Sequence, residues 1–409
     1  MHVDHRKLGR ELDLFDSDPL IGAGLPFWLP AGAAARHQVE SYLYELERRA
    51  GYQHVYSPAL GKKQMYELSG HWRNFADDMF PPMVLGGDEL VLRPSLCPHH
   101  ALIFKARQRS YRDLPLRIAE LGPMYRAERS GVLGGLSRVR SIQLNDSHLF
   151  CALDQVGEEV AGVLRLMHRA HDALGMRPSS VQLSLRGEGG KYAGDDDMWE
   201  QASALLRAAL DMSGISYQEA PGEAAFYGPK IDIQVEDAAG REWSLSTIQV
   251  DFHMPAQFGL EFVAPDSGRD RPVMVHRSLA GSMERLFGHL IEVHQGAFPL
   301  WYAPVQLDIL PISDDQAVAA SALKDRAIEA GLRAEIHYDG SIKARIHAAA
   351  DRKIPYMGIV GQREAADGLV ALRLRDGRQL PARPAAEAIA LIAAAAAESQ
   401  AGAEVRARP

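Results

Sequence analysis

Residues 118–150 read IAELGPMYRAERSGVLGGLSRVRSIQLNDSHLF, and this stretch decides the fold. Its two ends, 118–125 and 140–150, have the residue pattern of strands. The connection over 128–135 is rich in glycine and predicts a long loop. The stretch therefore predicts an antiparallel β-hairpin with a long connection.

Charged residues lie where this hairpin meets its loop. Arg126 and Glu128 follow the first strand, and Arg138 lies on the returning side. A guanidinium here can bind a phosphate, and a carboxylate can hold Mg²⁺ or the amino group of adenine. Taken alone, Arg-x-Glu is more often an ion pair on a hairpin surface.

Helices and strands are predicted on both sides of the hairpin. Apolar residues on one face, with Gly51 behind them, predict a helix over 34–50. The other predicted elements are a strand ending at Pro58 (52–56), a strand that passes through Cys97-Pro98 into a helix (92–104), a helix (156–174), three strands (230–235, 242–252, 273–275) and a helix (282–293).

A second region begins after the segment 296–301, where the pattern changes. Beyond it, predicted strands alternate with predicted helices: strands 305–310, 333–338, 356–360 and 369–375, and helices 317–329 and 341–351. Such alternation predicts a small α/β domain of about a hundred residues. We place the boundary near Leu300 and expect residues 399–409 to be frayed.

Composition limits the class of protein. The 409 residues, 46% hydrophobic and 24% charged, fit a soluble globular protein of two or three domains. No apolar run is long enough to span a membrane, and the N-terminus lacks the apolar core of a signal peptide. Two cysteines fit a reducing cytosol. The net charge of −8 does not exclude a nucleic-acid partner, because local Lys and Arg stripes supply phosphate contacts.

Two further motifs carry chemistry. Cys97, His148 and His276 offer one thiolate and two imidazoles, a set that suits zinc with a fourth position open. Ser282 and Arg285 lie at the start of a predicted helix after Gly281, where the helix N-terminus favours anions and Arg285 can reach a phosphate. Each motif alone is more often structural, and their combination makes them specific.

Together these motifs resemble those of class II aminoacyl-tRNA synthetases. The hairpin resembles motif 2 of that class, GSMER (281–285) resembles motif 3, and the helix and strand ending at Pro58 resemble motif 1, which lies at the dimer interface. The metal trio, LPLR (114–117), AFYGPK (225–230) and VMVHR (273–277) are similar to the threonyl-tRNA synthetase family. The resemblance extends from Asp4 to about Leu391.

The resemblance implies an α/β (α+β) fold. Residues 1–300 would form the antiparallel-sheet catalytic domain of class II synthetases, and residues 301–409 a smaller α/β anticodon-binding domain. It also implies a cytoplasmic homodimer without membrane contact. Its partners would be tRNA(Thr), L-threonine and ATP, and its metal ions Zn²⁺ and Mg²⁺.

The implied activity is that of a threonine–tRNA ligase. The carboxylate of threonine attacks the α-phosphate of ATP, and the threonyl group then passes to the 3′-OH of the tRNA. An apolar pocket separates threonine poorly from valine, which has nearly the same shape. A zinc ion with an open position binds the amino and hydroxyl groups of threonine, and valine offers no second ligand.

The resemblance also implies the roles of individual residues. The metal ligands would be Cys97, His148 and His276. The amino acid would contact Asp146, Tyr227, Gln249 and Lys230. ATP would contact Arg126, Glu128, Arg138, Ile142, Gln249, Ser282 and Arg285. Catalysis would depend on Arg126 and Arg285, with His71 assisting proton transfer. Anticodon bases would be read by Glu364 and Arg373, with Arg352 and Lys353 nearby for phosphate.

The chain departs from the family pattern in several places. It starts directly at the catalytic domain, so we expect no editing in cis and mischarging with serine unless another protein corrects it. Ile142 stands where the family usually has a phenylalanine stacked on adenine, and Leu144 where it usually has a glutamine. Ser95-Leu96 and His99 also differ beside the zinc cysteine, as does the segment 338–341.

Three functions remain open. The first is a working threonine ligase, either the housekeeping enzyme or a specialised duplicate that resists an inhibitor. The second is a ligase that activates threonine for an acceptor other than tRNA. The third is a non-catalytic tRNA-binding regulator, against which the retained catalytic residues argue.

Overall fold

The computed structural model describes residues 4–189, 192–237 and 240–406. Its centre is a sheet of eight strands in the order β10-β9-β11-β12-β15-β8-β7-β3. Neighbours run antiparallel except in the outermost pairs, β10 with β9 and β7 with β3. In sheet order the strands are Gln218–Pro221, Ser180–Leu185, Lys230–Glu236, Glu242–Asp251, Val273–Ser278, Ser141–Cys151, Leu116–Tyr125 and Gln53–His54.

The predicted hairpin is confirmed in β7 and β8. The two strands pair from Leu116 opposite Phe150 to Tyr125 opposite Ser141. Because side chains alternate along a strand, the even-numbered residues of β8 from 142 to 148 face one side of the sheet. The odd-numbered Leu149 and Cys151 face the other side and enter the main hydrophobic core.

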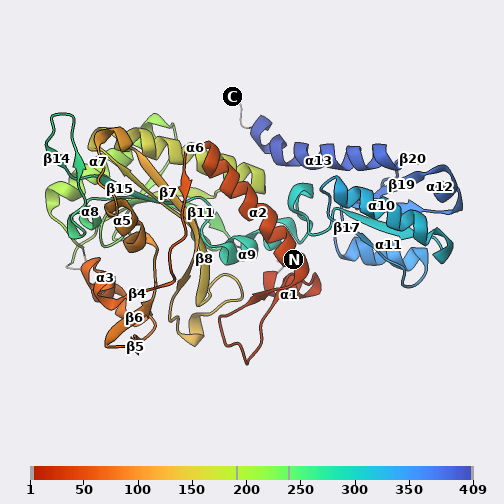
Figure 1. The fold of residues 1–409 in the computed structure, drawn as a ribbon, viewed down its shortest axis with the longest axis horizontal. Coiled ribbons are helices and arrows are strands. Elements are labelled where there is room, and N and C mark those ends of the chain that lie inside the picture. The colour runs from red at the N-terminus through yellow and green to blue at the C-terminus, as the bar shows by residue number, and fades with distance from the viewer. Residues whose placement is uncertain (1–3, 190–191, 238–239, 407–409) are drawn as a thin grey trace.

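Long helices cover the core side of this sheet. Helices α6 (Val156–Leu174) and α7 (Asp196–Met212) pack on it, and α2 (Pro30–Arg49) packs on α6 (Figure 1). The remaining helices of this part are α1 (His5–Glu11), α3 (Lys63–Leu68), α4 (His71–Phe75), α5 (Cys97–Lys105), α8 (His253–Gln257) and α9 (Met283–His294). No helix within the described residues is long and apolar enough to cross a bilayer.

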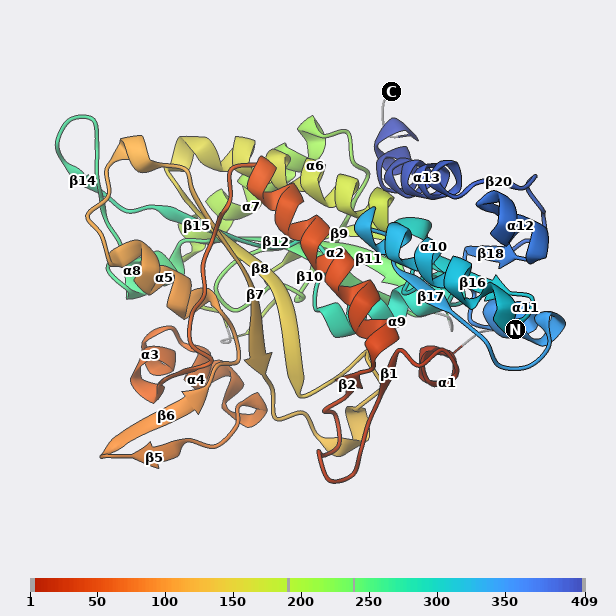
Figure 2. The same cartoon turned by 45° about the vertical axis from the view of Figure 1, so that its right-hand side comes forward.

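A small sheet forms a separate corner beside α3 and α4 (Figure 2). Its strands are β4 (Leu60–Lys62), β6 (Asp88–Leu92) and β5 (Met83–Leu85), and β4 and β5 flank β6. Tyr66, Met79 and Val91 form its small core. Two further pairs are β1 with β2 (Phe15–Asp16, Phe27–Trp28) and β13 with β14 (Phe262–Val263, Arg269–Asp270).

The region after residue 306 has its own five-stranded sheet, in the order β17-β16-β18-β19-β20. The first three strands in this order are parallel and β19 is antiparallel to β18, which confirms the predicted α/β alternation. The strands are Ala334–Ile336, Leu307–Pro311, Tyr356–Val360, Leu369–Leu374 and Arg383–Pro384, and the helices are α10 (Ala317–Glu329), α11 (Ile342–Asp351), α12 (Gln362–Asp367) and α13 (Ala385–Arg406).

The prediction of a frayed end was wrong for residues 399–406. They continue α13, which returns along the molecule to pack against α6 (Figure 1). Alanine is the strongest helix former, so the alanine-rich sequence of α13 favours this long helix. Residues 407–409 lie outside the described residues.

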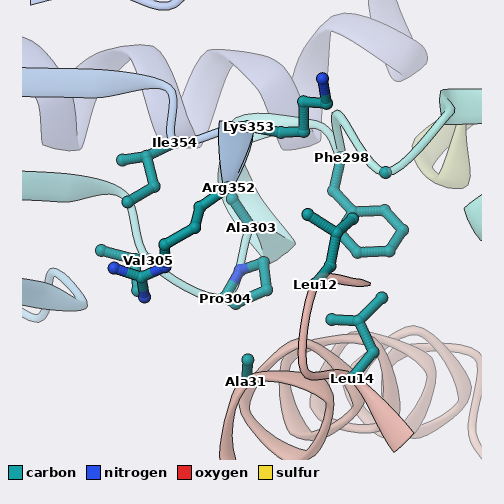
Figure 3. A pocket seen from close by; sticks show the side chains of 11 residues that line it. Leu12, Leu14, Ala31, Phe298, Ala303, Pro304, Val305, Arg352, Lys353 and Ile354 are labelled. Carbon is teal, nitrogen blue, oxygen red and sulfur yellow. The ribbon is translucent and has the colours of Figure 1, made fainter. Parts of the chain in front are cut away.

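The two sheets are joined through a buried segment at 300–302. Trp301 and Tyr302 belong to the core of the larger sheet, and their side chains donate hydrogen bonds to the carbonyls of Ala173 (3.0 Å) and Leu174 (3.1 Å). A cavity of about 20 Å³, room for about one water, lies beside this joint, where Leu12 and Phe298 lie next to each other (Figure 3).

Candidate active site

A cavity of about 410 Å³ opens on the side of the large sheet that faces away from α6 and α7. Residues from β8, β11, β12 and β15 line it because alternate side chains of each strand point to this face. The predicted site residues that line it are Cys97, Arg126, Glu128, Arg138, Ile142, Asp146, His148, Tyr227, Lys230, Gln249, His276, Ser282 and Arg285. The structure therefore brings together residues from very different parts of the sequence.

The predicted metal ligands meet at one end of this cavity. His148 and His276 lie directly opposite each other on β8 and β15, and Cys97 begins α5. Their ligand atoms all lie within 4.8 Å of one another, and all three residues are buried. Nε2 of His148 is 3.0 Å from Nδ1 of His276.

The chemistry of these donors fits a zinc ion. Nε2 of His276 lies 2.8 Å from a carboxylate oxygen of Asp251, so this nitrogen carries the proton and Nδ1 keeps its lone pair. Burial raises the pKa of the Cys97 thiol, and the nearby carboxylates of Asp146 and Asp251 raise it further. A bound cation offsets this cost because it favours the thiolate.

The residues predicted to contact the amino acid lie beside the metal ligands. Burial raises the pKa of Asp146 to about 6, and one of its oxygens lies 3.9 Å from Nε2 of His148. The hydroxyl of Tyr227 donates to Oε1 of Gln249, and its ring stacks on His276 with centroids 4.9 Å apart. Lys230 forms an ion pair of 2.9 Å with Asp232.

Arginines gather in another part of the cavity. The guanidinium of Arg126 forms no hydrogen bond or ion pair with any residue that the structure describes, whereas Arg138 pairs with Glu128 at 2.8 Å. Nε of Arg285 donates to the carbonyl of Ser137 at 2.9 Å. This part of the cavity thus holds one guanidinium without a protein partner among the described residues and two that are held by protein groups, an arrangement suited to an anionic ligand.

The start of α9 explains the need for Gly281. This residue has φ of +65°, and a Cβ atom there would lie 2.7 Å from the carbonyl oxygen of Leu245. The next residue, Ser282, caps the helix by accepting a hydrogen bond of 3.1 Å from the backbone N–H of Arg285. The glycine therefore lets the helix start close to the strand beside it.

Three predicted residues lie elsewhere. His71 is buried behind Cys97, with Nε2 3.6 Å from the sulfur, and burial lowers its pKa to about 3. Among the described residues that line the cavity, His71 is absent. Glu364 and Arg373 lie in the second sheet region, on α12 and β19, and Glu364 accepts a hydrogen bond from the backbone N–H of Gly361 at 3.1 Å.

The sequence interpretation missed several buried polar residues next to the site. His100 contacts His148, Glu120 contacts His100, and Asp251 contacts His276. A signal was present for two of them. His100 follows Cys97 by one helical turn, and Asp251 follows Gln249 by two residues on one strand, so each lies on the same face as a predicted residue.

Comparison with family models covers most of the chain. Residues 85–294 match the tRNA synthetase class II core domain (G, H, P, S and T), and residues 306–395 match an anticodon binding domain. All the described residues that line the cavity, from Ser95 to Arg285, lie within the first match.

Curated relatives agree with this assignment. The chain is 47% identical over 374 residues to the threonine–tRNA ligase of Bacillus velezensis and 48% identical over 379 residues to that of Streptococcus gordonii. Each alignment covers 90% of this chain and 58% of the relative. The chain thus spans little more than half the length of these relatives.

Solved structures of similar shape carry related names. The RNA binding domain of threonyl-tRNA synthetase from Cryptosporidium parvum superposes with a TM-score of 0.92 at 33% identity, covering 96% of this chain and 98% of that one. A putative threonyl-tRNA synthetase from Aeropyrum pernix superposes with a TM-score of 0.84 at 27% identity, covering 98% and 96%.

Proposed function

The chain belongs to the threonyl-tRNA synthetase family of class II aminoacyl-tRNA synthetases, and on this basis we propose that it joins L-threonine to the 3′ end of tRNA(Thr) at the expense of ATP. One observation carries the proposal. A single cavity contains a Cys/His/His set suited to a metal together with Arg126 and Arg285, and the guanidinium of Arg126 forms no hydrogen bond or ion pair with the described residues.

The amino acid occupies the end of the cavity with the metal ligands. We propose that Cys97, His148 and His276 hold Zn²⁺, which when bound supplies a Lewis acid with a position open to the amino and hydroxyl groups of threonine. The carboxylate of Asp146 accepts the hydrogen bond of the substrate hydroxyl. The Tyr227–Gln249 pair and Lys230 complete the wall around the amino acid.

Activation is an in-line displacement at the α-phosphate of ATP. A carboxylate oxygen of threonine forms a bond to phosphorus, the bond to the bridging oxygen breaks, and pyrophosphate leaves with the electron pair. Arg126 and Arg285 stabilise the negative charge that develops, and no enzyme nucleophile is required. We propose that Glu128 would hold Mg²⁺, which when bound would supply positive charge beside the phosphates.

Three further residues are proposed to contact ATP: Arg138, Ile142 and Ser282. Arg138, fixed by Glu128, supplies a second phosphate contact. Ile142 packs on adenine, and Ser282 lies at the helix N-terminus near the phosphates.

Transfer follows when the terminal ribose 3′-OH of the tRNA attacks the carbonyl carbon of the adenylate. The bond between the carbonyl carbon and the phosphate oxygen breaks, AMP leaves, and the proton of the hydroxyl passes to a base. We propose that His71 assists this proton transfer. Because its Nε2 faces Cys97 and is shielded from the cavity, direct assistance requires the ring to turn.

The smaller region, which we delimit at 301–409, is proposed to bind the anticodon. Arg373 on β19 and Glu364 on α12 are the proposed base-reading residues, since unpaired bases are read through hydrogen bonds on their edges. Arg352 is held by Glu335 at 2.7 Å, and we propose it and Lys353 for phosphate contacts.

We propose that α2 and β3 form the interface of a cytoplasmic homodimer. Tyr56 is 91% exposed and Tyr44 is 46% exposed, and both line a cavity of about 420 Å³ on this surface. Glu47 of α2 pairs with Arg277 at 2.7 Å, next to the metal ligand His276. The buried Glu47–Arg277 ion pair would therefore link an interface on α2 to the proposed metal site.

The departures at Ile142 and Leu144 support a narrower proposal, that this is a specialised copy with altered sensitivity to inhibitors of the site. Both side chains line the cavity. A non-hydrolysable threonyl-adenylate analogue should inhibit the Leu144→Gln variant and the natural protein to different extents. Equal inhibition of both would contradict this narrower proposal.

The test of the main proposal is charging of purified tRNA(Thr) with labelled threonine, ATP and zinc-replete protein. We expect threonyl-tRNA, and none when the terminal ribose has been destroyed by periodate. Threonine-dependent pyrophosphate exchange without charging would contradict the tRNA step and support a different acceptor. Absence of both activities would contradict the enzyme and leave a tRNA-binding regulator.

A further inference from the structure

We infer that Glu120 and His100 form a buried relay that fixes the ring orientation and tautomer of His148, and that Asp251 does the same for His276. The inference rests on the proposed zinc site, which these three residues would support without lining the cavity. They are positioning residues, since each acts through a metal ligand and none contacts the substrate.

The relay behind His148 has a defined direction of hydrogen bonding. Nδ1 of His100 lies 2.7 Å from Nδ1 of His148, and Nε2 of His100 lies 3.1 Å from Oε2 of Glu120. Glu120 also accepts hydrogen bonds from Ser57 Oγ at 2.6 Å and Arg93 Nη2 at 3.0 Å. A carboxylate bound by so many donors is ionised and can only accept.

The charge of Glu120 is balanced within the protein. Burial alone would raise its pKa, but hydrogen bonds from His100 and Ser57 and the charge of Arg93 lower it to about 2. Since Glu120 can only accept, the Nε2 of His100 that lies beside it is the donor of that hydrogen bond. Its Nε2–H then donates to Glu120, and its Nδ1 accepts from Nδ1–H of His148.

The same logic holds on the other side. Asp251 is fully buried, and its Oδ1 accepts from the backbone N–H of Met254 at 2.9 Å, which fixes the carboxylate. Its Oδ2 accepts from Nε2–H of His276 at 2.8 Å. The lone pair of His276 is therefore on Nδ1, the atom that faces His148.

The two supports together leave two imidazole lone pairs facing one position, where a cation would be favoured. With these tautomers, the lone pairs of His148 Nε2 and His276 Nδ1 point toward each other across 3.0 Å, next to the sulfur of Cys97. Two acceptors at this distance repel unless a cation lies between them. Loss of such supporting contacts typically weakens metal affinity about 10–100-fold.

The experiment measures zinc affinity of the full chain by competition with a chromophoric chelator. His100→Leu removes the acceptor for His148 and should weaken zinc binding about 10–100-fold. His100→Asn should have a smaller effect, because its Oδ1 can still accept from His148. Absorption of the Co²⁺-loaded proteins gives a second readout, in which the bands should shift in His100→Leu.

The matched control is His171→Leu. His171 is also a buried histidine of the sheet region, and its Nε2 lies 2.8 Å from Ser246 Oγ, but it has no contact with the metal ligands within the described structure. This variant should lose stability and keep the zinc affinity of the natural protein. Asp251→Ala, which removes the acceptor for His276, tests the second support if His100→Leu does not fold, and should also weaken zinc binding.

The outcomes separate the inference from the function on which it rests. If the natural protein binds zinc and a folded His100→Leu binds it equally tightly with an unchanged Co²⁺ spectrum, the relay is refuted and the zinc site stands. For a His100→Leu that does not fold, unchanged zinc affinity in Asp251→Ala refutes the supports. If the natural protein binds no zinc, the proposed metal site itself fails.

Discussion

At the scale of single residues, substitution of Arg126 is expected to lower activity with the least change in the free energy of unfolding. Its guanidinium forms no hydrogen bond or ion pair with the described residues, so removing this side chain leaves no polar group without a partner. We predict that Arg126→Ala keeps the free energy of unfolding within about 0.5 kcal/mol. Threonine-dependent pyrophosphate exchange should fall about 10²–10³-fold, as for loss of one charge-stabilising donor.

Thermal unfolding and pyrophosphate exchange, measured on one preparation, check this prediction. Arg138→Ala is the control, because Arg138 is half exposed and already paired with Glu128. Its exchange rate should fall less. An Arg126→Ala variant with near-natural exchange would remove Arg126 from the phosphate site.

Ile142 gives a gain-of-affinity prediction. It lines the cavity, and the sequence resemblance places it where the family is expected to have an aromatic ring. An aromatic stack contributes about 1 kcal/mol beyond area burial. Ile142→Phe should therefore lower the KM for ATP about fivefold with little change in the KM for threonine, and steady-state exchange assays would show it. An increased KM for ATP would mean that Ile142 does not face adenine.

Among single residues, the candidate metal ligands could be predicted from their chemical type. The residues that hydrogen-bond to them were not predicted. Cys97, His148 and His276 could be picked out because few residue types bind zinc. The sequence interpretation noted His99, which replaces a glycine, yet His100 is the residue that contacts His148. Helical spacing favours His100, which lies one turn after Cys97 on the same face of α5, over His99.

At the scale of elements, helix α1 connects α9 to the hairpin loop through His5. Its Nδ1 lies 2.7 Å from Glu292 on α9, and its Nε2 accepts from the backbone N–H of Leu136 at 3.1 Å. The next residue, Ser137, accepts the hydrogen bond of Arg285. One buried imidazole thus holds the loop that positions a proposed phosphate ligand.

We predict that His5→Asn destabilises the protein by about 1–3 kcal/mol, because the buried N–H of Leu136 loses its acceptor. The KM for ATP should also rise, since the loop that holds Arg285 loosens. His5→Gln should be milder because its Oε1 can reach Leu136. Urea unfolding and the KM for ATP check both variants. If both variants had the stability and the KM for ATP of the natural protein, His5 would not hold the hairpin loop.

Some long elements were predictable from their periodic pattern, and others were missed. The hairpin and α6 follow from strand alternation and from apolar spacing over many residues. Of the predicted strand 52–56, only Gln53–His54 forms a strand, β3, which pairs with β7. Helix α7 was not assigned, although Trp199, Ala202 and Leu206 recur at helical spacing and are buried.

At the scale of the whole molecule, the joint at 300–302 binds the two sheet regions together. Trp301 is 5% exposed, belongs to the main core and donates a hydrogen bond to Ala173. We predict that Trp301→Ala costs about 3–5 kcal/mol, as for a large core truncation. Trp301→Phe should cost much less because it keeps most of the packing. Urea unfolding measures the free energy of unfolding of both variants. Equal values for Trp301→Ala and Trp301→Phe would contradict close packing of Trp301 at the joint.

Long-range contacts set the limit of prediction at this scale. The alternation after residue 306 predicted the second sheet from local patterns alone. The return of α13 to α6 brings together segments more than two hundred residues apart. No local pattern in either segment predicts that the two helices pack together. The pairing of β15 with β8, which brings the proposed metal ligands His148 and His276 together, is of the same kind.

The measurement that tests the central claim most directly is amino-acid-dependent pyrophosphate exchange before and after zinc removal. The natural protein, freed of metal by a chelator and dialysed, should lose exchange with threonine and regain it on addition of zinc. The zinc-loaded protein should accept threonine and serine, which both carry the hydroxyl, and reject valine. Full exchange by metal-free protein, or equal exchange with valine, would contradict zinc-based recognition of threonine.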